Sequence, residues 1–385
     1  MISAAKHFIV MGAGAVGCYL GARLIAHGQS VSLVGRPRTI DPIRAGGLRV
    51  TDLDGFDATI ASAQIQAYDD FTSAFSAVES NRIEPNNLVI LLCVKGNATV
   101  KAALEVEATV SANFGSKLGT KFGTKLGTKR DPNEPLNAAA PGQTFTPYVC
   151  SVISMQNGVE NVKRIQDNAP NLTALAGMVP YNVGMRSANH VHRGVNGMLA
   201  MQRSLATEQI APIFDAAGLP CRLHDNMINV QWGKLLLNLN NPVNAISNLP
   251  LLYELKDWHF RRVFAALQLE ALAVLKTANI TPIKAGMVDP AVLPRLLQLP
   301  NFVFERIAAK LLKIDPTARS SMWDDVQRAN TTEVDDLCGA VVRLASTHGL
   351  DAPLNRLMCT LLSQLKKGDQ MSGVQLWQQI KLAQR

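Results

Sequence analysis

The sequence lacks the marks of a disulfide scaffold, a metal site and a membrane span. Its six cysteines are scattered, with no CxxC pair and no histidines at metal-ligand spacing, so we expect reduced, mostly buried thiols. No apolar run approaches the roughly 20 residues that a membrane helix requires. The N-terminus leads straight into an apolar strand without a cleavable signal. A cytoplasmic location without membrane association is therefore expected.

Signatures of several other enzyme classes are also missing. There is no Gly-x-Ser-x-Gly nucleophile motif and no Walker sequence. His190 and His192 lie in a strand-like segment without an apparent third ligand. We interpret them as surface histidines and expect no metal.

The charge balance shows where basic residues gather. The formal net charge is +8, and one short repeat holds four of the lysines: Lys117, Lys121, Lys125 and Lys129. Removing those four leaves +4, which suits an anionic small substrate and a phosphorylated cofactor. We expect no nucleic-acid partner.

The first half of the chain alternates strands with helices. A helix from about Val16 ends at His27-Gly28, where glycine is typical of a helix C-terminus. Residues 47–60 alternate loosely, which favours a hairpin. Strands are expected over residues 8–10, 31–34, 88–94 and 148–155. This order predicts an α/β fold with an N-terminal Rossmann-type, doubly wound parallel sheet.

The second half is predicted to be an all-α domain. We divide the chain into a dinucleotide-binding domain, residues 1–223, and a helical substrate and catalytic domain, residues 224–385. Helices are expected over roughly 226–248, 255–278, 290–312, 318–346 and 353–366. Two acidic pairs in these helices are interpreted as solvated faces or as partners of Arg328 and Arg343: Asp324-Asp325 and Asp335-Asp336.

A four-residue repeat interrupts the first domain. Residues 114–129 read FGSK-LGTK-FGTK-LGTK, followed by RDPNEPLNAAAPGQ. Glycine at every fourth position opposes both helix and strand. We interpret residues of about 111–147 as a flexible surface insertion, with a polyanion-binding tongue as the alternative.

A glycine-rich turn near the N-terminus indicates a dinucleotide site. A GxGxxG motif follows the first strand and opens a helix: Gly12, Ala13, Gly14, Ala15, Val16 and Gly17. In this context, the glycines permit a tight turn, close approach of a pyrophosphate and close helix packing. The helix N-terminus then offers N–H donors to the phosphates. A purely structural glycine turn is the alternative.

Residues at the ends of later strands bear on the choice of cofactor. An NAD site normally has an acidic residue after the second strand, where this chain has Arg36 and Arg38. A guanidinium suits a 2′-phosphate, which favours NADPH over NADH. Lys95 and Asn157 also follow strands, at the sheet edge where ligands gather.

The segment from Gln231 to Ile246 is an apolar helix with one lysine. On an ideal helix Asn238 and Asn241 lie about 40° and 20° from Lys234, on either side, so the three form one polar stripe. Pro242 removes the helical partner of the Asn238 carbonyl, which predicts a kink. The opposite face is apolar: Leu236, Leu239 and Val243.

This stripe is suited to a particular reaction. Hydride addition to a ketone leaves an alkoxide that must receive a proton, and a partly desolvated Lys234 is a usable general acid. Neutral asparagine amides bind hydroxyl and carboxylate oxygens without competing for that proton. A snorkelling lysine beside helix-capping asparagines is the alternative.

Taken in order, these motifs resemble the ketopantoate reductases over residues of about 7–360. The GxGxxG, the strand-end lysine, Asn157-Gly158, KLLLN from Lys234, and Ser320-Ser321-Met322 followed by Thr332-Glu333-Val334-Asp335 all have counterparts. The resemblance implies NADPH-dependent reduction of 2-dehydropantoate to (R)-pantoate for pantothenate and coenzyme A synthesis, by a monomer or homodimer. It implies binding of the pyrophosphate by the glycine turn and of the 2′-phosphate by Arg36.

The resemblance also assigns roles around the reacting carbonyl. Lys95 and Asn157 would position the nicotinamide ribose, Lys234 would donate the proton, and Glu333 would bond within the Lys234–substrate network. The substrate would be held by three residues: Asn238, Asn241 and Ser321.

Two departures from the family pattern leave the substrate open. Pro242 stands where the family has its second asparagine, and the family's PNGEL reads Pro250-Leu-Leu-Tyr-Glu-Leu255 here. A reductase of another small 2-oxo acid is therefore an alternative. A non-catalytic dinucleotide-binding sensor is the alternative of another class, although a sensor has no need of a buried proton donor.

Overall fold

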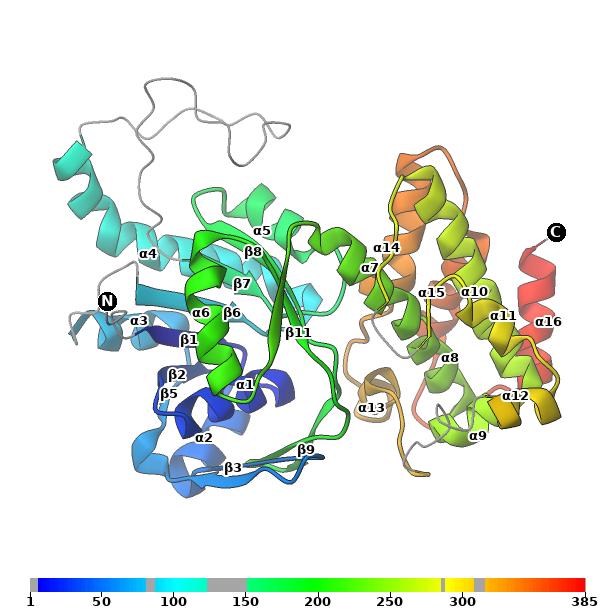
Figure 1. The fold of residues 1–385 in the computed structure, drawn as a ribbon, viewed down its shortest axis with the longest axis horizontal. Coiled ribbons are helices and arrows are strands. Elements are labelled where there is room, and N and C mark those ends of the chain that lie inside the picture. The colour runs from blue at the N-terminus through cyan, green and yellow to red at the C-terminus, as the bar shows by residue number, and fades with distance from the viewer. Residues whose placement is uncertain (1–5, 81–86, 123–150, 285–287, 308–315, 385) are drawn as a thin grey trace.

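The computed structural model describes residues 6–80, 87–122, 151–284, 288–307 and 316–384. Within these ranges, residues up to His224 form two sheets with flanking helices, and residues from Met227 onward form helices without strands (Figure 1). The expected α/β fold with a helical second domain is confirmed. None of the described helices has the length and apolarity of a membrane span.

The main sheet has eight strands in the order β12-β11-β8-β7-β6-β1-β2-β5. All neighbours are parallel except β8 and β11. The chain leaves β1 toward β2 on one side and later returns to β6 on the other, so β1 and β6 flank the topological switch point of the sheet, where open α/β sheets form their ligand crevice. In sheet order the strands are β12 (Cys221–His224), β11 (Leu199–Gln202), β8 (Thr173–Met178), β7 (Ser151–Ser154), β6 (Leu88–Leu92), β1 (His7–Met11), β2 (Ser30–Val34) and β5 (Gln66–Tyr68).

Helices cover both faces of this sheet. Side chains alternate along β1, so Phe8 and Val10 enter one core while Ile9 and Met11 enter the other. The first core includes α1 (Ala15–Ala26), α2 (Pro37–Gly46) and α6 (Leu205–Ala216). The second includes α3 (Phe71–Ser80), α4 (Thr99–Phe122) and α5 (Asn161–Asn168).

A smaller sheet packs against the N-terminal helix. Its order is β4 (Asp57–Ile60), β3 (Leu48–Asp52), β10 (His190–Arg193) and β9 (Val183–Ser187), and the β3–β4 hairpin confirms the prediction for residues 47–60. Asp52 accepts hydrogen bonds from Arg23 of α1 and from Arg193 of β10, at 2.7 and 3.1 Å. This buried cluster connects the two layers.

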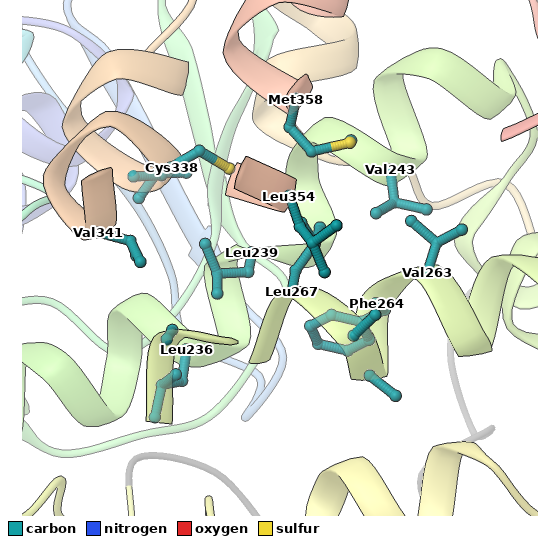
Figure 2. Close-up of a cluster of buried hydrophobic side chains, with 14 of the residues drawn as sticks. Leu236, Leu239, Val243, Val263, Phe264, Leu267, Cys338, Val341, Leu354 and Met358 are labelled. Atoms are coloured by element: carbon teal, nitrogen blue, oxygen red, sulfur yellow. The ribbon is translucent and has the colours of Figure 1, made fainter. Parts of the chain in front are cut away.

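The helical domain is built around the helix that carries Lys234. The predicted apolar face is buried: Leu236, Leu239 and Val243 are 1%, 0% and 0% exposed (Figure 2). The helix breaks at Leu239, three residues before Pro242, which is the kink that the proline led us to expect. The described helices of this domain are α7 (Met227–Asn238), α8 (Asn240–Ser247), α9 (Leu251–Lys256), α10 (Trp258–Thr277), α11 (Leu293–Leu297), α12 (Asn301–Ile307), α13 (Ser321–Gln327), α14 (Val334–Thr347), α15 (Pro353–Gln364) and α16 (Gly373–Ala383).

Three helix predictions need correction. The helix expected over 290–312 is two short helices separated at Pro300, whose missing N–H and ring disfavour a continuous helix. The helix expected over 318–346 is interrupted before α14, where Ala329 adopts a left-handed conformation with φ 52°. Helix α16 lies beyond the predicted helices.

The repeat segment begins differently from the prediction. The backbone of α4 continues as helix through residues 114–122, although glycine at every fourth position favoured neither helix nor strand. Adding residues to an existing helix costs less than nucleating a new one, and each glycine costs only about 1 kcal/mol. The remainder of the expected insertion, residues 123–147, lies outside the described residues.

Candidate active site between the domains

The glycine turn lies at the switch point between β1 and β6. Gly12 has φ 110°, and a Cβ there would lie 2.7 Å from the backbone nitrogen of Val94, which follows β6. A Cβ on Gly17 would lie 2.2 Å from the Gly12 carbonyl oxygen, so α1 packs directly on the turn. A Cβ on Gly14 would have no neighbour within 4 Å. This open backbone at the start of a helix leaves room for a ligand, and helix N-termini of this kind favour anions.

The end of the second strand adjoins the glycine turn. A Cβ on Gly35 would lie 2.8 Å from the Cβ of Ala13, so the chain entering α2 passes beside the motif. Arg36 precedes α2, and Arg36 and Arg38 are both exposed. Neither guanidinium pairs with an acidic group among the described residues. Both are thus available to an anionic ligand beside the turn.

Lys234 reaches from α7 to the edge of the main sheet. Its Nζ donates a hydrogen bond to Oδ1 of Asn157, 2.7 Å away, and another to the carbonyl oxygen of Val179. Asn157 follows β7 and Val179 follows β8, so the ammonium lies at the carboxyl ends of two neighbouring parallel strands. This is the edge at which open α/β sheets bind their ligands.

Burial changes the titration of the groups around this lysine. Desolvation lowers the pKa of Lys234 to about 8, and the nearby charge of Glu333 offsets part of that shift. Asn157 Nδ2 donates to Glu333 Oε2 at 3.1 Å, so one amide connects the ammonium with the carboxyl group. Burial raises the pKa of Glu333, while the hydrogen bond from Asn157 and the charge of Lys95 act in the opposite direction. An amine with a pKa this close to neutrality suits proton transfer.

The three residues expected to hold substrate lie at or near the ends of helices. Asn238 is the last residue of α7, Asn241 lies in the first turn of α8, and Ser321 is the first residue of α13. Asn238 and Asn241 are half-buried and Ser321 is exposed. Their side chains make no hydrogen bond to any residue that the structure describes, so their polar atoms are available to a ligand. We call these three residues the substrate wall.

A buried polar network supports the substrate wall, and sequence reasoning missed it. Ser320 donates from its backbone N to Asn244 Oδ1 at 2.9 Å and from its hydroxyl to the Asn241 carbonyl at 3.3 Å. Asn244 Nδ2 donates to the fully buried Glu254 at 2.7 Å. Burial raises the pKa of Glu254 to about 8, against the hydrogen bonds from Asn244 and Asn240. The retained Glu-Leu of the altered PNGEL motif was the one sequence signal for Glu254.

Two family models match the chain in the order of its two domains. "Ketopantoate reductase PanE/ApbA" matches residues 8–115, and "Ketopantoate reductase PanE/ApbA C terminal" matches residues 226–366. The chain belongs to the ketopantoate reductase family. The first match contains the glycine turn and Lys95, and the second contains Lys234 and Glu333.

Three similar proteins share only about a quarter of this chain's residues or fewer. A 2-dehydropantoate 2-reductase of Pyrococcus horikoshii is 22% identical over 358 residues, which cover 92% of this chain and 95% of that protein. The crystal structure of a PanE/ApbA family ketopantoate reductase from Ralstonia eutropha is similar with a TM-score of 0.68 and 26% identity, over 93% of this chain and 97% of that one. D-mandelate dehydrogenase, solved with NADH and anilino(oxo)acetate, shares the fold with a TM-score of 0.66 at 16% identity over 93% and 97% of the two chains.

Two acidic residues that we expected on solvated helix faces instead contact the first domain. Asp325 of α13 forms an ion pair with Lys95, which follows β6. Asp336 of α14 accepts a hydrogen bond from Arg164 of α5 at 2.5 Å. Both carboxylates are mostly buried, so the prediction of solvated faces is wrong for them. They lie at the interface between the domains, and their partners Lys95 and Arg164 are distant from them in sequence.

The predicted pairing with Arg343 is partly correct. Arg343 lies 3.9 Å from Asp335, but its closer partner is Glu160 beside α5, at 2.6 Å. His190 and His192 lie on β10 as expected for a strand, but they are half-buried and both rings bond to the hydroxyl of Thr51, at 2.9 and 2.8 Å. Neither histidine contributes to the site at Lys234.

Proposed function

We propose that this protein reduces 2-dehydropantoate to (R)-pantoate with NADPH, as a step toward pantothenate and coenzyme A. The observation that carries the proposal is the chain Lys234–Asn157–Glu333, which lies at the same carboxyl edge of the sheet as the open glycine turn. The half-buried lysine there donates its hydrogen bonds to neutral groups, the amide of Asn157 and the carbonyl of Val179. It is therefore ready to give up a proton.

When bound, NADPH supplies the hydride that adds to the ketone carbon. The protein's own task is then to protonate the oxygen of that ketone. Lys234 performs this step from Nζ, because desolvation weakens its hold on the proton. Asn157 keeps the ammonium at the strand ends through its carbonyl oxygen. The substrate wall binds the carboxylate and hydroxyl of the substrate with neutral donors, which leaves Lys234 the main proton source.

The preference for NADPH follows from the end of β2. The ribose hydroxyls of NADH are usually held by an acidic residue at this point, and Arg36 stands there instead. Its guanidinium is exposed beside the glycine turn and can bind a 2′-phosphate through two parallel hydrogen bonds. Arg38 adds a second positive charge nearby.

Another small 2-oxo acid is the second candidate substrate. Leu251 and Leu252 occupy the place where the family pattern has an asparagine, which removes an amide and adds apolar surface. The fold is also that of D-mandelate dehydrogenase, so the architecture accommodates a bulkier acid in at least one other protein. Lys234 and the substrate wall would act in the same way on either substrate.

Steady-state NADPH oxidation with a panel of 2-oxo acids tests the proposal. The panel contains 2-dehydropantoate, 2-oxoisovalerate and benzoylformate, each measured with NADPH and with NADH. We expect the highest kcat/KM for 2-dehydropantoate with NADPH. Preferred turnover of benzoylformate would assign the protein to the second candidate. Tight NADPH binding without turnover of any acid would favour a dinucleotide sensor.

A further inference from the structure

Lys95 is held by a residue of the other domain. Its ammonium forms an ion pair with Oδ1 of Asp325, and 230 residues separate the two in sequence. The lysine side chain is 46% exposed, whereas the aspartate side chain is 12% exposed. A mostly buried carboxylate thus fixes the direction of a cation that would otherwise be mobile on the surface.

The helix that carries Asp325 also supports the substrate wall. Ser320, immediately before α13, bonds to the Asn241 carbonyl and to the Asn244 side chain. Asp325 lies about one turn further along α13 and bonds to Lys95. The short helix α13 therefore connects to the substrate wall at its start, through Ser320, and to Lys95 near its centre, through Asp325.

We propose that Asp325 is a positioning residue that orients Lys95 toward the cofactor crevice and connects it to the substrate wall through α13. An ammonium has three donors, so a pair with Asp325 leaves two for ribose hydroxyls. Because the pair orders the lysine side chain in advance, binding of the dinucleotide does not have to restrict its rotamers. This inference rests on the proposed function in one respect, namely that the crevice binds NADPH.

A simple electrostatic role for Asp325 predicts the opposite result. A carboxylate beside Lys95 reduces the positive charge that an anionic dinucleotide meets. If Asp325 only competed for the lysine, its removal would strengthen NADPH binding. If Asp325 positions the lysine, its removal weakens binding. The sign of the change in dissociation constant therefore separates the two roles.

Fluorescence titration of the full-length protein with NADPH measures that sign without any substrate. We expect Asp325→Asn to raise the dissociation constant about 5-fold, the scale of a partly exposed ion pair, and Asp325→Glu to recover part of the loss. Arg343→Gln is the matched control, because it breaks another pair between the domains, with Glu160. Unchanged or tighter binding by Asp325→Asn, or equal weakening by Arg343→Gln, would overturn the proposal.

A double-mutant cycle with Lys95→Met tests whether Asp325 acts through the lysine. The account expects Asp325→Asn to have almost no further effect on NADPH binding in the Lys95→Met background. Additive effects of the two substitutions, in variants whose thermal unfolding is cooperative, would contradict it. A wild-type protein that binds no NADPH would overturn the cofactor assignment and this inference together. Binding of NADPH with no turnover would refute the proposed reaction alone.

Discussion

Nζ of Lys234 lies 2.7 Å from Oδ1 of Asn157, and the two residues belong to different domains. Lys234 is on the first helix of the helical domain, and Asn157 follows a central strand of the sheet. The proposed proton donor and the amide that holds it therefore meet only when the two domains are in contact. The arrangement that we propose to be catalytic is thus a property of the interface between the domains.

The reductase rate is expected to fall at alkaline pH. Burial lowers the pKa of Lys234 to about 8, so the donor is protonated below that pH and loses its proton as the pH rises through it. A profile of kcat/KM against pH measures this alkaline decrease, the alkaline limb of the profile. We expect a midpoint near pH 8. A rate that stays constant up to pH values near the ordinary lysine pKa of about 10.4 would contradict the assignment.

Glu333→Gln is expected to move that alkaline limb to lower pH. The negative charge of Glu333 raises the pKa of Lys234, and glutamine keeps the shape but not the charge. The pH profile of the variant provides the measurement. Asp335→Asn is the control, because Asp335 is an exposed carboxylate two residues after Glu333. A limb that stays in place, or moves to higher pH, would show that Glu333 does not act on Lys234 by its charge.

Arg36→Ala is expected to narrow the preference for NADPH over NADH by roughly 10-fold, the scale of one charge-assisted contact. The 2′-phosphate distinguishes the two cofactors, so the ratio of their kcat/KM values isolates its contribution. Arg49→Ala is a suitable control, since Arg49 is an exposed arginine of the smaller sheet. An unchanged ratio would place the 2′-phosphate contact elsewhere, with Arg38 as the next residue to replace.

Gly233→Ala is expected to destabilise the helical domain by about 1–3 kcal/mol. A Cβ at Gly233 would lie 1.8 Å from the carbonyl oxygen of Ile283, and backbone cannot yield as a flexible side chain does. The midpoint of denaturant unfolding measures the loss. Gly184→Ala, where a Cβ would meet nothing within 4 Å, is the matched control. Equal stability of the two variants would show that the segment at Ile283 is free to move.

The sequence predicts the parts of the molecule in which local pattern decides the structure. The apolar face of α7 and α8, the break near Pro242 and the glycine turn each follow from neighbouring residues. Asp325 and Asp336 could not be predicted in this way, because their partners Lys95 and Arg164 come from the other domain. A buried carboxylate and a solvated one look the same in a single sequence.

The support of the substrate wall is hidden for the same reason. Ser320 and Asn244 are 76 residues apart, and their hydrogen bond exists only because α13 packs on α8. Sequence resemblance pointed to Ser321, which is exposed and makes no side-chain hydrogen bond to the described residues. The neighbouring Ser320, which fixes the wall in place, gave no separate signal.

A single-turnover experiment on Lys234→Met tests the central claim most directly. Enzyme saturated with NADPH is mixed with 2-dehydropantoate, or with whichever acid the panel selects, and the loss of NADPH absorbance is followed in time. Lys276→Met, an exposed lysine of α10, is the control. We predict oxidation roughly 10²–10⁴-fold slower in Lys234→Met, with NADPH affinity close to that of the wild type. Oxidation at the wild-type rate would remove Lys234 from the reaction.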